Sequence, residues 1–237
     1  MAAPTIHSGT SGFSYKEWKG HFYPDDLPAA QMLAYYAERL PSVEINNTFY
    51  RLPRRDVLES WAEQVPDAFR FVIKASRRIT HFKRLKPPYD EVDYLLETLG
   101  ALGGKMGAIL FQLPPDMKKD TDRLEAFLQN VPDTVSAAFE FRNDSWFDSD
   151  VTDLLREHGR ALVHVDTEEK PVMVLEETAD WGYLRLRRPG YTEEDLGAWA
   201  ERLAGTGWKR VFVFFKHEEE GAGPRMASRF QEMAASK

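Results

Sequence analysis

Residues 42–53 read SVEINNTFYRLP, and the interpretation of this stretch decides the fold. Val43 and Ile45 alternate with Glu44 and Asn46, which is the two-residue period of a β-strand. A strand buried on both faces does not normally carry a carboxylate and an amide, because a charge removed from water without a partner is costly. The stretch therefore indicates a strand with one apolar face and one face that meets other polar groups.

Seven further segments have the same short, β-branched or aromatic character, and they alternate with amphipathic stretches of helical period. With residues 43–47, the predicted strands are 5–9, 70–75, 108–113, 137–142, 161–166, 183–187 and 210–215. The connection TEEKPVMVLEETADWG (167–182) contains a proline and has no helical stripe. It is predicted to be a loop or a short extra strand.

Eight strands and about seven helices in 237 residues predict a single-domain α/β protein, a parallel (β/α)8 TIM barrel over residues 1–237 with one irregular crossover after the sixth strand. No stretch rich in glycine, serine or proline divides the chain. An open, doubly wound sheet is the alternative. It is less favoured because GTSGFSYKEW (9–18) has two glycines but no G-x-G-x-x-G fingerprint.

Composition narrows the class of protein. The net charge of −7 disfavours a protein that coats nucleic acid or an anionic membrane through bulk charge. The absence of cysteine excludes disulfides and thiolate chemistry. With no apolar run of membrane-spanning length and no signal-peptide pattern, we expect a cytoplasmic protein without a membrane partner.

The barrel interpretation explains the polar face of residues 42–47. Alternate residues of a barrel strand face the helices and the lumen, and active sites form where the strands end. We assign the apolar residues of each strand to the helix side, including Val163 and Val165. The predicted lumen then contains mainly polar side chains, namely Glu44, Asn46, Lys74, Gln112, Glu140, Arg142, His164, Asp166, Arg185 and Arg187.

Four segments resemble, in order, successive motifs of the YecE-like TIM-barrel family, called domain of unknown function 72. They are SVEINNTFYRLP, RFVIKASRRITH, GAILFQLPP and AAFEFRNDSW, and SGTSGFSYKEWKGHFYP (8–24) is similar to the family's first motif. The resemblance spans most of the chain and implies a (β/α)8 barrel, but no assigned catalytic residues. The chain departs from the family pattern in YLRLRRPGY (183–191), which keeps Arg185 but lacks the His-Gly pair of the Arg-Leu-His-Gly motif.

The candidate catalytic residues are carboxylates at strand ends and one histidine. Glu44, Glu140 and Asp166 stand near the ends of three different strands, where acid/base pairs of barrels occur. His81 follows the third strand and belongs to the residue type that titrates near neutral pH. The alternative is a structural ion network neutralised by nearby cations. The candidate ligand-binding residues are Tyr15, Trp18, Asn46, Asn47, Tyr50, Lys74, Gln112, Arg142, Trp146 and Arg185.

These residues predict an enzyme-like pocket for a small anionic, ring-containing molecule, such as a phosphorylated sugar or a nucleotide fragment. Hydrolysis or isomerisation is favoured over redox chemistry, with no cofactor and with Glu44 and Glu140 as the proton-transfer groups. Two alternatives stay open. One is a non-catalytic module that binds nucleic acid or protein through basic residues at the rim. The other is a metal-dependent phosphoesterase, in which His164 binds a divalent metal together with Glu44 and Glu140.

Overall fold

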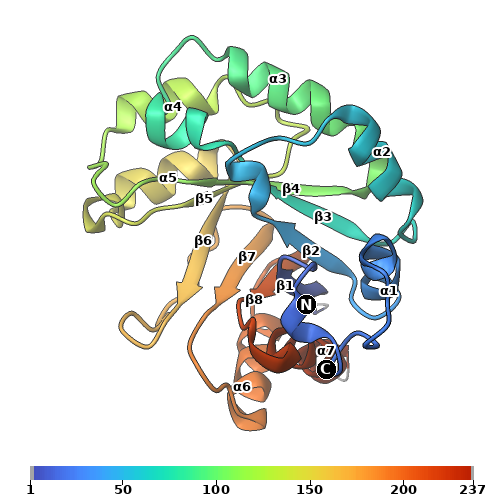
Figure 1. Cartoon of the computed structure of the whole chain (residues 1–237). Helices are drawn as coiled ribbons and strands as arrows, with labels where there is room; N and C mark the ends of the chain where they lie inside the picture. The colour runs from blue at the N-terminus through green and yellow to red at the C-terminus, as the bar shows by residue number, and fades with distance from the viewer. Residues whose placement is uncertain (1–2, 236–237) are drawn as a thin grey trace.

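Eight parallel strands close into a barrel in the computed structural model, which describes residues 3–235 (Figure 1). Each strand pairs with the next along the chain, and the last pairs with the first. The strand ends differ from the predicted ones by at most two residues, so the TIM-barrel prediction is confirmed. The strands are β1 (Thr5–Ser11), β2 (Ser42–Ile45), β3 (Arg70–Lys74), β4 (Met106–Gln112), β5 (Ala137–Glu140), β6 (Ala161–Asp166), β7 (Trp181–Leu186) and β8 (Arg210–Phe215).

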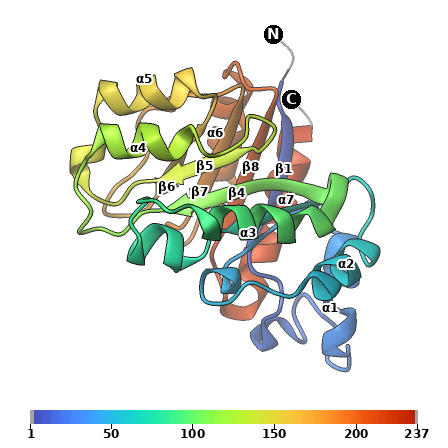
Figure 2. The same cartoon turned by 90° about the horizontal axis from the view of Figure 1, so that it is seen from above.

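Helices follow the strands at every connection but one, and Figure 2 shows α3, α4 and α5 on the outside of the strands. The helices are α1 (Met32–Ala37), α2 (Arg55–Glu63), α3 (Asp90–Leu99), α4 (Thr121–Leu128), α5 (Ser149–Glu157), α6 (Glu193–Ala204) and α7 (Ala222–Ala235). Helix α6 begins with a capping box between Thr192 and Asp195. The connection from β6 to β7, all of it within the described residues, contains no helix, as the sequence predicts.

The lumen is apolar in its lower part and polar where the strands end. A buried cluster separate from the helix-facing core fills the lower lumen; it contains Val72, Ala108, Leu110, Ala138, Ala161, Val163, Trp181, Tyr183, Phe212 and Phe214. The polar side chains expected on β2, β4, β5 and β7 lie above this layer. The barrel is therefore a packed core that carries a polar C-terminal end, as in other TIM barrels.

Strand β6 is oriented opposite to the prediction. Val163 belongs to the lumen cluster and the partly buried Val165 packs against it, whereas Leu162 packs with the helix-facing core. By strand alternation, His164 and Asp166 then face outward with Leu162. The assumption that apolar residues face outward fails here because no helix follows β6 to cover that side.

Strands β5 and β6 share a short stretch of pairing. They have two register pairs, Ala138 with Ala161 and Phe139 with Leu162, whereas β7 and β8 have six. The C-terminal end of β5 is therefore not bonded to the upper part of β6. The barrel wall is open at this point, beside the connection that lacks a helix.

Candidate functional site

Arg185 lies at the centre of the polar end of the lumen. Its guanidinium donates from Nη2 to Glu44 Oε1 at 2.6 Å and from Nη1 to Glu140 Oε2 at 2.5 Å. Strands β7, β2 and β5 supply these three side chains, and each is at most 2% exposed. The carboxylates thus hold the guanidinium from two sides and fix its plane.

Both oxygens of Glu44 are hydrogen-bonded. Ser11 Oγ and Asn46 Nδ2 each donate to Oε1 at 2.8 Å, and the Tyr183 hydroxyl donates to Oε2 at 2.5 Å. Burial alone would raise the pKa of Glu44, but the charges of Arg185 and Arg187 together with these hydrogen bonds hold that pKa below its usual value. Glu44 is therefore ionised at neutral pH.

Glu140 is held in the same way from the opposite side. Gln112 Nε2 donates to its Oε1 at 2.8 Å, and Arg142 Nε does so at 3.2 Å. Burial opposes ionisation, yet the neighbouring arginines and Gln112 lower the pKa of Glu140 to about 2. An acid/base catalyst is most effective with a pKa near the working pH. The pKa of each glutamate is therefore shifted away from that range.

Two other titratable side chains, Lys74 and His81, lie beside the network. Lys74 Nζ donates to Gln112 Oε1 at 2.8 Å and lies 4.2 Å from the centre of the Phe49 ring. Burial, reinforced by the charge of Arg185, lowers the pKa of Lys74 to about 8. His81 packs edge-on against Phe49 at 4.9 Å between ring centres, and burial together with Lys74 lowers its pKa as well.

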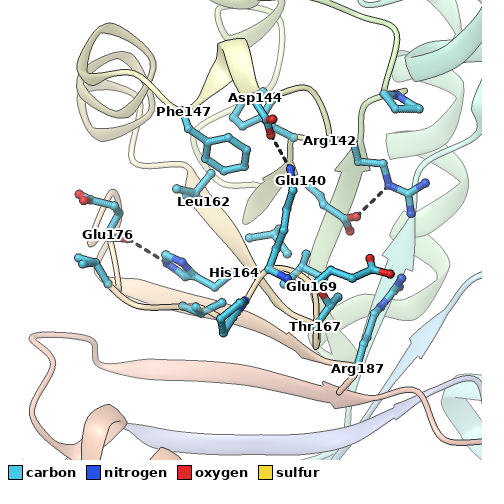
Figure 3. A pocket seen from close by; sticks show the side chains of 18 residues that line it. Glu140, Arg142, Asp144, Phe147, Leu162, His164, Thr167, Glu169, Glu176 and Arg187 are labelled. Atoms are coloured by element: carbon cyan, nitrogen blue, oxygen red, sulfur yellow. Dashed lines mark hydrogen bonds and ion pairs between the residues drawn. The ribbon is translucent and has the colours of Figure 1, made fainter. Parts of the chain in front are cut away.

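A cavity of about 600 Å³ opens next to this network, at the gap between β5 and β6. Arg187, Arg142 and Glu140 line its inner end, and Figure 3 shows their side chains on one side of the cavity. Arg187 Nε is buried and has no hydrogen-bond partner among residues 3–235. A buried guanidinium nitrogen without a partner is costly, and within residues 3–235 the Nε of Arg185 is in the same state.

The structure brings together several of the predicted ligand-binding residues. Asn46, Lys74, Gln112, Arg142 and Arg185 form one continuous set of hydrogen bonds with the two glutamates. Other predicted residues lie at the edge of the set.

Tyr15 lies near Glu44, but its hydroxyl donates to the Ser11 carbonyl at 2.6 Å. Asn47 is exposed, and Tyr50 is 69% exposed, with Arg77 over its ring at 5.3 Å.

The structure places four of the predicted residues outside the polar network of the lumen. Asp166 faces outward, where it accepts hydrogen bonds from the Tyr191 hydroxyl at 2.5 Å and the Val172 amide at 3.0 Å. His164 likewise points away from the lumen, with Nε2 3.3 Å from the Glu176 carbonyl.

Trp18 and Trp146 are each 1% exposed, and their indoles donate to the backbone carbonyls of Glu218 and Met117. They support the loops above the strands and do not face the cavity, because their rings pack against neighbouring aromatic side chains.

The sequence interpretation missed two residues of the network and the outer half of the cavity. Residues two positions apart on a strand face the same side of the sheet. Tyr183 is two positions before Arg185 on β7, and Ser11 is two positions after Gly9 on β1, so strand alternation could have predicted that both face the lumen. Phe147 and Val174 lie in loops outside the strands and carried no such signal.

The structure does not bring His164 together with the two glutamates of the alternative metal site. Glu44 faces the lumen, whereas His164 faces the outer surface. Across residues 3–235, no group of three histidine, aspartate or glutamate side chains is placed to hold a metal ion.

Two of the basic residues at the rim are paired with carboxylates, Arg84 with Asp116 and Arg188 with Asp195, both at 2.5 Å.

Comparison with known proteins connects this geometry to a family. The model of the family described as "Protein of unknown function DUF72" matches residues 7–237. The UPF0759 protein YunF of Bacillus subtilis (strain 168) is 28% identical over 152 residues, which cover 60% of this chain and 52% of YunF. The UPF0759 protein YecE of Escherichia coli (strain K12) is 30% identical over 141 residues, or 58% of this chain and 52% of YecE. The aligned region thus spans about half the length of these relatives.

Solved structures agree with the barrel. A DUF72 family protein from Thermotoga maritima superimposes with a TM-score of 0.82 at 27% identity and covers 98% of this chain and 99% of its own. A second, from Enterococcus faecalis, gives a TM-score of 0.78 at 21% identity, covering 98% and 96%. None of the helices in residues 3–235 combines the length and apolar character needed to span a membrane.

Proposed function

Because this chain belongs to the DUF72 family, whose description assigns no activity, we propose a function from the site itself: an enzyme that binds a small dianionic molecule at the C-terminal mouth of the barrel. The unpartnered Nε of Arg187, buried at the inner end of the cavity, is the observation that carries this proposal. An oxyanion of a phosphate or carboxylate group is the acceptor that a guanidinium fits best.

The buried part of the site carries an excess of positive charge, and the exposed rim of the cavity adds Asp144, Glu169 and Glu176 against Lys170. The two buried glutamates are accompanied by four cations, namely Lys74, Arg142, Arg185 and Arg187. Burial and the charge of Arg185 lower the pKa of Arg187, which means that its charged form is held at a cost. A bound dianion would neutralise the excess and remove that cost.

Glu44 and Glu140 position Arg185 in this proposal, and Lys74 takes the proton-transfer role. With a pKa of about 8, Lys74 exists in both protonation states near neutral pH. Gln112 connects Lys74 to Glu140, which lines the cavity, through two hydrogen bonds of 2.8 Å. Proton transfer of this kind serves an isomerisation or a hydrolysis, which are the reaction classes that we propose.

Calorimetric titration with methylphosphonate tests the anion site. We expect Arg187→Gln to weaken binding roughly ten- to hundredfold, since a hydrogen bond to a charged group contributes about 1.5–3 kcal/mol. Lys209→Gln makes the same charge change at the opposite end of the barrel, where Lys209 is 80% exposed, and should leave the affinity unchanged. Equal effects of the two variants, or no binding by the wild-type protein, would contradict the proposal.

Turnover of phosphorylated and carboxylated metabolites, followed by mass spectrometry, tests the role of Lys74. Lys74→Arg keeps the positive charge but removes a group that titrates near neutral pH. We expect this variant to lose at least tenfold in turnover while its affinity for methylphosphonate stays within a few-fold of wild type. Full activity of the variant would exclude Lys74 as the proton-transfer residue.

A further inference from the structure

The cavity continues from the anion site to the outer surface of the barrel. Its lining includes Val163 and Val165, which face the lumen, and also Leu162 and His164, which face outward. A single cavity reaches both sides of β6 because this strand pairs with β5 at two positions near its start and is free beyond them. The absence of a helix after β6 leaves the outer half open.

The two halves of the cavity differ in polarity. Arg142, Arg187 and Glu140 line the inner end, whereas Phe147, Leu162 and Val174 line the outer part, as Figure 3 shows for the labelled residues. Phe147 is 59% exposed and Val174 is 66% exposed. Their apolar surface therefore faces water in the absence of a ligand.

The histidine within the outer half is uncharged. Burial lowers the pKa of His164 to about 4, and the side chain is 6% exposed. The charged side chains of the outer half lie at the rim of the cavity. Lys170 is paired with Asp144 at 2.6 Å, and Glu169 and Glu176 are exposed. The wall between these rim groups is therefore suited to apolar atoms and not to a second charged group.

We infer that the ligand is an amphipathic anion, whose dianionic group binds at Arg142 and Arg187 and whose aliphatic or aromatic tail lies against Phe147, Leu162 and Val174. This inference rests on the proposed anion site and makes it more specific. A phosphosugar has hydroxyl groups along its length, and those that lie against Phe147, Leu162 and Val174 would lose water without finding partners there. The outer half thus selects a phosphate or carboxylate that carries a hydrocarbon tail.

A series of n-alkylphosphonates tests this inference, because the head group is constant and only the tail grows. We expect the Kd measured by calorimetry to fall from methyl- to butyl- to hexylphosphonate, by up to about fourfold per added methylene. Phe147→Ser and Val174→Ser alter exposed side chains, so both should fold. Each should remove most of the gain with tail length and leave the affinity for methylphosphonate unchanged.

Tyr94→Ser is the matched control, because Tyr94 is also 59% exposed but lies on α3, away from the cavity. It should preserve the dependence on tail length. If all three phosphonates bind the wild-type protein with the same affinity, the apolar subsite is excluded while the anion site stands. If none of them binds, the anion site itself is excluded, and the inference falls with it.

Discussion

Two sides of the same barrel mouth differ in how completely they are closed. Around Arg185, all four oxygens of Glu44 and Glu140 accept hydrogen bonds, and the three side chains are almost fully buried. Between β5 and β6, the wall opens into a cavity of about 600 Å³. The closed side is spanned by side chains from β2, β5 and β7, whereas the open side adjoins the one connection without a helix. A rigid charged centre thus stands next to a surface that has room for a ligand.

The largest expected effect comes from removing the centre of the closed side. Arg185→Met leaves Glu44 and Glu140 as buried charges without their shared partner, and we expect it to lower the free energy of unfolding by about 3–5 kcal/mol. Arg142→Met is the control, since Arg142 also bonds to Glu140 but is 39% exposed and should cost less than about 1 kcal/mol. Urea denaturation measures both values. Similar losses would show that burial does not distinguish the two arginines.

Acidic pH should lower the free energy of unfolding, because it protonates Glu140 on the closed side. Its pKa is about 2 in the folded protein against an ordinary value of 4.5, so the unfolded chain binds more protons between these pH values. The stabilisation is therefore complete above pH 4.5 and lost as the pH falls towards 2, by about 3 kcal/mol for this one group.

Unfolding curves at several pH values measure this slope. Glu140→Gln should reduce it, whereas Glu176→Gln, which alters an exposed residue on the cavity rim, should not. An unchanged slope in Glu140→Gln would contradict the assignment of this part of the acid response to Glu140.

The closed side was largely predictable from the sequence, and the open side was not. Strand alternation is enough to bring Glu44, Gln112, Glu140 and Arg185 into one lumen, because each strand there has an apolar face that packs on helices. The same rule failed for β6, in which both faces carry apolar residues and the outer face has no helix over it. His164 and Asp166 were therefore assigned to the wrong side.

The sequence did contain a sign of this exception. The connection from residue 167 to 182 has a proline and no helical stripe, which correctly predicts the missing helix. A missing helix removes the reason for the outward face of β6 to be uniformly apolar. The positions of Phe147 and Val174 depend on loop conformation, however, and no periodic pattern determines them.

A smaller loss is expected from one hydroxyl group of the closed side. Tyr183→Phe removes the donor to Glu44 Oε2 and leaves a buried carboxylate oxygen without that hydrogen bond, which should cost about 1–3 kcal/mol. Tyr50→Phe removes a hydroxyl from a side chain that is 69% exposed, and the change should stay within about 0.5 kcal/mol. Thermal unfolding of the two variants compares them directly, and equal stability would argue against a closed network.

The smallest effect is expected on the open side, where an ion pair as short as those of Arg185 is exposed to solvent. Lys170 and Asp144 are bonded at 2.6 Å across the cavity rim, but their side chains are 69% and 79% exposed. Asp144→Asn should therefore change the free energy of unfolding by less than about 1 kcal/mol, because solvent screens the pair. A loss comparable with that of Arg185→Met would mean that the rim is as rigid as the centre. The contrast between the two sides would then lie in shape alone and not in the strength of their ion pairs.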